Sequence, residues 1–221
     1  AVYSERIRLA KHAGMQVMEM YRRNIRPRDI MTKEAVLNAL TVDMALGCST
    51  NSMLHLPAIA HEIGMDFDIS FANEISAKTP NLCHLAPAGP TYMEDLNEAG
   101  GVYAVMNELS KKNLLNLDCM TVTGKTVGEN LKKVDYAYDR RVIRSIDDPI
   151  SPVGGMCILK GNLAPNGAVI KRSAATERLL HHRGRAKVFD DLSVAEKWLA
   201  DENSDVDENT VIVLRGYGPK G

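Results

Sequence analysis

The chain has 221 residues, of which 45% are hydrophobic and 25% are charged, a composition typical of a folded globular protein. Lysine and arginine number 27 and aspartate and glutamate number 28, so the formal net charge is −1. This balance provides no basic field for nucleic acid or an anionic membrane surface. No apolar run approaches the roughly 20 residues of a membrane span. We therefore expect neither nucleic acid nor a membrane as a partner.

The ends and the cysteines carry further expectations. The first residues already have helical character, and the last ones form a glycine-rich turn directly after a strand-like run, so we expect a chain truncated at both ends. The cysteines are widely spaced and form no CxxC pair, which fits neither a zinc site nor a dense disulfide framework. Free thiols indicate a reducing compartment, and we expect a cytoplasmic protein. The four cysteines are Cys48, Cys83, Cys119 and Cys157.

Helical periodicity dominates the first part of the chain. Thr32 is expected to cap a strong helix that is apolar on nearly all sides, and should therefore be buried, and that ends at Gly47. The next helix should start within residues 51–54, because Pro57 is tolerated only near the first turn.

Shorter helices are expected downstream. Ser70 is a candidate cap for one of them, and Gly100 with Gly101 should separate two others. Thr126 and Glu129 have the spacing of a capping box, which predicts a further helix start.

The character of the sequence changes near residue 150, where two prolines and two glycines fall within residues 149–155. Beyond this point the apolar runs are short and typical of strands, except for one helix that opens at Ser193. We expect a boundary between a mainly helical α/β part, residues 1–150, and a β-rich part, residues 151–221. The expected strand runs are 156–159, 168–170, 188–189 and 211–214.

A polar break between two apolar helices is the first candidate site. Ser49, Thr50 and Asn51 open the second of these helices, and His55 follows one turn later. A helix N-terminus attracts carboxylate or phosphate, and these side chains would add donors beside it. The same residue types are also preferred helix caps, so capping alone is the competing interpretation.

Two other segments are weaker candidates. Residues 161–171 contain Pro165, Asn166 and Gly167, which favour a tight turn between strands, and Lys171 could pair with a carboxylate or remain solvated. Residues 181–184 contain two adjacent histidines, but with no carboxylate at ligand spacing a surface loop is the better interpretation. The chain contains no dinucleotide, P-loop, HExxH or nucleophile-elbow motif.

Taken together, these stretches resemble the dehydratase family that includes dihydroxy-acid dehydratase and phosphogluconate dehydratase. The order and spacing of the shared motifs hold over essentially the whole chain, and the segment 121–126 resembles the dihydroxy-acid members most. One departure is Cys48, which stands where the family usually has glycine. The motifs that carry the resemblance are LGCSTN at 46–51, LHL at 54–56, MEDL at 93–96, TVTGKT at 121–126, GNLAPNGAV at 161–169, VFD at 188–190 and GPKG at 218–221.

The resemblance implies a hydro-lyase that converts 2,3-dihydroxy carboxylic acids into 2-oxo acids in valine and isoleucine biosynthesis. It implies an iron–sulfur cluster and Mg²⁺ in the parent enzyme, a serine base, a homodimer and a barrel-like second domain. Ser49, Thr50, Asn51 and His55 would then border the substrate pocket. A sugar-acid dehydratase is the close alternative, and a non-catalytic scaffold with the same fold is an alternative of another class.

The metal-binding and cluster-binding motifs of the family are expected outside this chain, with the aspartate, lysine and cysteine motifs before Ala1 and the glutamate and serine motifs after Gly221. Cys48 lies in no such motif. We therefore expect the chain alone to contain no catalytic, metal-binding or cofactor-binding residues, to hold neither cofactor and to be inactive.

Overall fold

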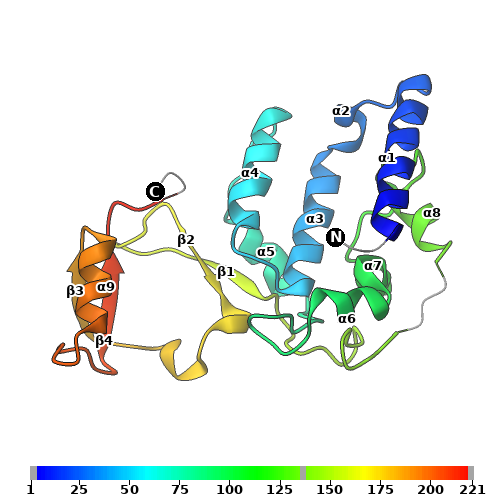
Figure 1. The fold of residues 1–221 in the computed structure, drawn as a ribbon. Coiled ribbons are helices and arrows are strands. Elements are labelled where there is room, and N and C mark those ends of the chain that lie inside the picture. Colours follow the sequence, from blue (N-terminus) through cyan, green and yellow to red (C-terminus); the bar gives the residue numbers. More distant parts are fainter. Residues whose placement is uncertain (1–3, 135–137, 219–221) are drawn as a thin grey trace. The chain divides into compact units, whose positions relative to one another are not determined.

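The structure is a computed structural model that describes residues 4–134 and 138–218 (Figure 1). Its contacts divide the chain into two compact units, residues 1–174 and residues 175–221, and each is described by itself. Helices dominate the first unit, and strands appear only after residue 155, so the α/β class expected from the sequence is confirmed. The domain boundary expected at residue 150 and the barrel-like completion of the second part stay predictions.

In the first unit the described helices precede a β-hairpin. The helices are α1 (Ser4–Arg22), α2 (Pro27–Ile30), α3 (Lys33–Leu46), α4 (Ser52–Glu62), α5 (Phe71–Lys78), α6 (Met93–Glu98), α7 (Gly101–Ser110) and α8 (Val127–Leu131). The hairpin strands are β1 (Met156–Leu159) and β2 (Ala168–Lys171), and a short 3₁₀ turn, η1 (Arg172–Ala174), follows them.

Helix α3 is the central element of this unit. The Thr32 hydroxyl accepts a hydrogen bond from the Ala35 N–H at 3.3 Å, and Gly47 ends the helix with a left-handed φ of +61°, so both predicted ends are confirmed. The helix contacts α4, α5 and α7, and Figure 1 shows α4 next to it. Its side chains fill two apolar clusters, one with Leu40 and Met44 and the other with Ala45 and Leu46.

The β-hairpin belongs to the same core. Strands β1 and β2 pair antiparallel, with Met156 opposite Lys171, and Gly167 adopts a positive φ of +110° in the connection, as the turn residues predicted. Side chains of α5 bond to the backbone of β1: Ser76 Oγ donates to the Met156 carbonyl at 2.7 Å, and Asn73 exchanges two hydrogen bonds with Ile158. The hairpin is therefore fixed to the helical layer through hydrogen bonds between α5 side chains and its own backbone.

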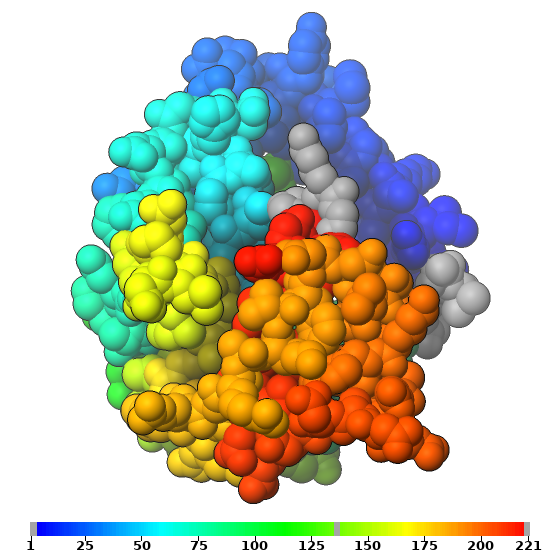
Figure 2. Space-filling view, turned by 90° about the vertical axis from the view of Figure 1, so that its left-hand side faces the viewer, coloured from blue at the N-terminus to red at the C-terminus, as the bar shows by residue number. Residues whose placement is uncertain are grey.

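The second unit is a β–α–β arrangement. It begins after η1 with a second 3₁₀ turn, η2 (Glu177–Leu179), followed by β3 (Arg185–Phe189), α9 (Leu192–Ala200) and β4 (Thr210–Leu214). The two strands pair parallel, with α9 as the crossover, as parallel strands require. Phe189 packs on Trp198 with ring centroids 5.3 Å apart, and Figure 2 shows this unit in orange and red.

Two predicted helix caps were wrong in detail. Ser70 precedes α5, but its backbone is already helical and its buried hydroxyl has no hydrogen-bond partner; Asp68 instead accepts the Ser70 N–H at 2.8 Å. Helix α9 begins at Leu192 rather than Ser193, because Asp191 is the cap and accepts the Ser193 N–H. The capping box of α8 is confirmed, since Thr126 and Glu129 exchange both expected bonds.

Helix α1 is the least buried helix of the first unit. It has no buried residue, and apolar side chains such as Ile7 and Tyr21 are about four-fifths exposed. Gln16 donates to the Val122 carbonyl at 2.6 Å, and Arg23, just past the helix, donates to the Gly124 carbonyl at 3.1 Å. In the described part of the chain, no helix has both the length and the apolar character that crossing a membrane requires.

Candidate functional site

The polar break between α3 and α4 forms a short, self-bonded turn. Ser49 Oγ accepts the N–H of Asn51 at 3.2 Å, and the Ser49 carbonyl accepts the N–H of Ser52 at 3.1 Å. The Thr50 carbonyl accepts the N–H of Met53 at 3.0 Å. Because these amides have acceptors within the turn, the groups that it offers to solvent are mainly side chains.

The four residues predicted for the pocket lie at this one end of α4. Ser49, Thr50, Asn51 and His55 are all exposed, and the N–H of His55 bonds to the Asn51 carbonyl at 3.0 Å. Asn51 is the N-cap by position, but its side chain makes no capping bond. Capping therefore engages the Ser49 side chain, while the Asn51 side chain takes no part in it.

The C-terminal end of α3, which carries the turn, is held by segments far away in the sequence. The Ala45 carbonyl accepts hydrogen bonds from Asn81 Nδ2 at 3.1 Å and from the N–H of Leu82 at 2.7 Å. The Met44 carbonyl accepts the N–H of Gly155 at 3.0 Å. These bonds satisfy carbonyls that a helix end leaves without partners, and they fix the point from which the turn starts.

Two glycines allow this close packing. A Cβ on Gly155 would lie 2.6 Å from the Cα of Gly47, and one on Gly47 would lie 3.0 Å from Asn81 Nδ2 and 3.2 Å from Ser173 Oγ. The Ser173 hydroxyl is buried and has no hydrogen-bond partner in the structure. The residues after β2 thus lie directly against the start of the polar turn.

A buried carboxylate lies beneath the turn. Asp43 is only 7% exposed, and its Oδ2 lies 2.8 Å from Ser52 Oγ. Burial raises the pKa of the Asp43 carboxyl, whereas the Ser52 hydroxyl, the Cys48 thiol and the charge of Lys171 act in the opposite direction. Burial, followed by the charge of Asp43, raises the pKa of the Cys48 thiol to about 12.

Two segments that were separate candidates in the sequence thus lie near each other in the structure. They are the polar turn and the 161–171 segment, which ends at Lys171. Asp43 and Ser52 were missed by sequence reasoning. The available signal was an aspartate within a helix that is otherwise apolar on nearly all sides, because a buried charge requires partners.

The other candidate groups are not brought together. His181 and His182 lie in an exposed loop, as expected. Cys83 is buried, and burial raises the pKa of its thiol to about 12. Among residues 4–134 and 138–218, no three histidine, cysteine, aspartate or glutamate side chains are grouped as a metal ion would need.

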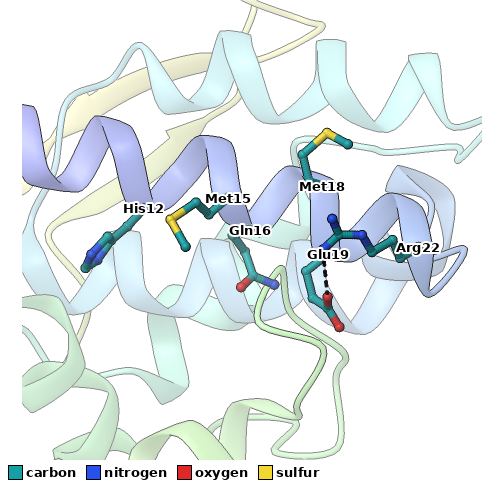
Figure 3. A pocket seen from close by; sticks show the side chains of 6 residues that line it. All are labelled: His12, Met15, Gln16, Met18, Glu19 and Arg22. Atoms are coloured by element: carbon teal, nitrogen blue, oxygen red, sulfur yellow. Dashed lines mark ion pairs between the residues drawn. The ribbon is translucent and has the colours of Figure 1, made fainter.

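Two surface hollows of the first unit lie apart from the polar turn. One follows α1 alone and is lined by His12, Met15, Gln16, Met18, Glu19 and Arg22. Figure 3 shows that Gln16 and Glu19 project from one side of this helix and Met18 from the other. A second, of about 200 Å³, lies between α3, α5 and the segment before α5, with Val36, Phe67 and Ile75 among its apolar lining residues. Neither hollow is lined by Ser49, Thr50, Asn51 or His55, the residues predicted for the substrate pocket.

Comparison with known proteins adds an independent finding. Residues 1–130 match the model described as dihydroxy-acid/6-phosphogluconate dehydratase N-terminal, and residues 141–221 match the corresponding C-terminal model. Relatives named dihydroxy-acid dehydratase from Agathobacter rectalis, Lachnospira eligens and Clostridium beijerinckii are 66%, 63% and 59% identical over the whole chain. The chain spans 39% of the length of each of these relatives. Because the two models together cover nearly all of its residues, the chain belongs to the dihydroxy-acid/6-phosphogluconate dehydratase family.

Proposed function

We propose that this chain is part of a hydro-lyase that removes water from 2,3-dihydroxy carboxylic acids to give 2-oxo acids in valine and isoleucine biosynthesis. The observation that carries the proposal is the whole-chain identity of 54–66% to relatives that are all named dihydroxy-acid dehydratase. The exposed polar turn at the start of α4 supports it, because that turn offers hydroxyl and amide groups suited to a hydroxy acid.

In this proposal Ser49, Thr50 and Asn51 border the substrate pocket. Their exposed hydroxyl and amide groups are free to donate hydrogen bonds to a substrate carboxylate or hydroxyl. His55 lies one turn further along the same helix and would support the pocket from there. The positive charge of Lys171 lies near the turn and favours an anionic ligand.

The proposed enzyme also needs an iron–sulfur cluster and Mg²⁺, which would supply Lewis-acid assistance to a poor leaving group, hydroxide. The described residues do not fit either group. In the described part of the chain, no three histidine, cysteine, aspartate or glutamate side chains lie together as such a group would need, and Cys83 is 1% exposed. We propose that other parts of a longer protein hold both groups, and that this protein is a cytoplasmic homodimer.

The proposal predicts that the 221-residue chain alone is inactive. The purified chain and the full-length protein would each be reconstituted with iron, sulfide and Mg²⁺ and assayed on 2,3-dihydroxy-3-methylbutanoate. We expect turnover by the full-length protein only. Turnover by the chain alone above a no-enzyme background would contradict its predicted inactivity. A lack of turnover by both the chain and the full-length protein would contradict the proposed function.

The substrate class separates the runner-up functions. The description of the family includes 6-phosphogluconate dehydratase, so a sugar acid is the alternative substrate. Parallel kcat/KM values of the full-length protein on 6-phosphogluconate and on 2,3-dihydroxy-3-methylbutanoate would decide between them. A non-catalytic scaffold is favoured if both substrates are inert and the flanking sequence lacks the cluster cysteines and the serine.

A further inference from the structure

The polar turn rests on a buried carboxylate that the proposed chemistry does not use. Asp43 lies in the last turn of α3, is 7% exposed, and belongs to a helix whose other buried side chains are mostly apolar. Burying a carboxylate is unfavourable unless hydrogen bonds or a counter-charge compensate. Its backbone carbonyl also accepts hydrogen bonds from the N–H groups of Gly47 and Cys48, so two backbone bonds join this residue to the start of the turn.

Ser52 connects that carboxylate to the other end of the turn. Its Oγ lies 2.8 Å from Asp43 Oδ2 and 2.8 Å from the carbonyl oxygen of Ser49. A hydroxyl has one proton to donate but two lone pairs to accept with. Ser52 therefore either donates to an ionised Asp43, or accepts from a protonated Asp43 and donates to Ser49. In both arrangements the hydroxyl lies between the carboxylate and the turn.

Lys171 supplies the opposite charge from another element. It is the last residue of β2, and its positive charge opposes the rise that burial causes in the pKa of both Asp43 and Cys48. The hairpin that carries it is anchored next to the turn through Gly155 and Ser173, which pack against Gly47. The turn is thus held from α3 below and from the hairpin beside it.

We propose that Asp43 and Ser52 are positioning residues that fix the Ser49–Thr50–Asn51 turn on the end of α3, with Lys171 as the balancing charge. The inference rests on the proposed function, because it assigns these residues to the pocket that the turn borders. None of the three is proposed to react with substrate. Their role is to hold the exposed hydroxyl and amide groups in one arrangement.

The Cys48 thiol reports on the charges directly, because its reaction with iodoacetamide requires the thiolate. In the full-length protein at a pH of about 8.5, Asp43→Asn should speed alkylation of Cys48, and Lys171→Met should slow it, by about tenfold for each unit of pKa change. Peptide mass spectrometry measures the rate at Cys48, with buried Cys83 as the internal control. Faster alkylation in Asp43→Asn together with slower alkylation in Lys171→Met supports the proposed arrangement of the two charges around Cys48. Acceleration in both variants indicates general loosening and would overturn it, as would no change in either.

Amide hydrogen exchange tests the positioning without any assay of activity. Asp43→Asn and Ser52→Ala should speed exchange at Asn51, Ser52 and Met53 by about tenfold or more, because opening of the turn becomes easier. Ser52→Thr keeps the hydroxyl and should restore slow exchange, and Asp66→Asn, an exposed carboxylate of the same unit, should have no effect. Unchanged exchange in Asp43→Asn and Ser52→Ala would overturn the proposal.

Kinetics of the reconstituted full-length enzyme then connect the turn to the pocket. Ser52→Ala should lower kcat/KM by about 10- to 100-fold, mainly through KM, because a misplaced pocket weakens binding. Ser52→Thr should recover most of that loss. If the parent enzyme is inactive on both substrate types, the proposed function fails, whereas the exchange and alkylation results still decide the positioning.

Discussion

The side chain of Glu108 is fully buried and accepts a hydrogen bond from the backbone N–H of Ile146 at 3.0 Å. Arg140 also donates to this carboxylate at 3.0 Å, and Lys111 donates to it from the end of the same helix. One carboxylate therefore ties α7 to the segment that leads toward the β-hairpin.

Replacement of Glu108 by glutamine should be strongly destabilising. The change removes the charge that balances Arg140 and Lys111, and hydrogen bonds to a charged group contribute about 1.5–3 kcal/mol. Urea unfolding of the variant and the parent chain measures the difference. Glu98→Gln, an exposed residue of α6, is the matched control and should change the free energy of unfolding by less than about 0.5 kcal/mol. Equal effects of the two substitutions would refute the assignment.

The contribution of Glu108 should also depend on pH. Burial raises the pKa of its carboxyl, but the hydrogen bonds from Lys111, Arg140 and the Ile146 N–H outweigh burial, so its pKa is lowered. The stability it provides is therefore present above the unfolded-state pKa of about 4.3 and is lost as the pH falls through the folded-state value. The difference in unfolding free energy between the parent and Glu108→Gln should shrink between about pH 6 and pH 3. A constant difference over this range would contradict the prediction.

Asn38→Ala should detach a loop from α3. Asn38 is 5% exposed, its Nδ2 donates to the Asn116 carbonyl at 3.0 Å, and its Oδ1 accepts the Asn116 N–H at 2.8 Å. Alanine would leave both backbone groups without these partners, at a cost of about 2–3 kcal/mol. Thermal unfolding measures the loss, and Asn97→Ala on the exposed face of α6 should leave the midpoint nearly unchanged.

Two glycine substitutions should change the stability of the protein in opposite directions. Gly155→Ala would place a Cβ 2.6 Å from the Gly47 Cα, a backbone atom that cannot move aside easily, and should destabilise the protein by about 1–3 kcal/mol. Gly14→Ala lies in α1 with no atom within 4 Å of the new Cβ, and should stabilise by about 0.5–1 kcal/mol through helix propensity. Thermal unfolding of both variants checks the pair, and a loss of stability in Gly14→Ala would contradict it.

Elements whose signals are local could be predicted from the sequence. Thr32, Gly47 and the Thr126 capping box lie within a few residues of the backbone groups they satisfy, so their roles were predictable. Ser70 failed because a nearby residue, Asp68, took the role of cap.

Contacts between distant segments were not predictable in the same way. From the sequence, Lys171 could be identified only as a cation without a known partner, because its charge acts on Asp43 only once the chain has folded. The polar turn itself was found, but the carboxylate beneath it was not. Period and capping rules describe neighbours along the chain, and they contain no information on which distant segment closes over a helix end.

The hairpin has a consequence for how relatives of this protein can be recombined. Met156 and Ile158 of β1 are 0% and 3% exposed and complete the cluster formed by Leu40, Met44 and Ala72. Those two residues fall in the region matched by the C-terminal model, whereas their partners fall in the N-terminal one. The two regions are therefore not interchangeable modules: a chimera joined between them inherits half of a core from each parent, and folds well only where the two halves fit.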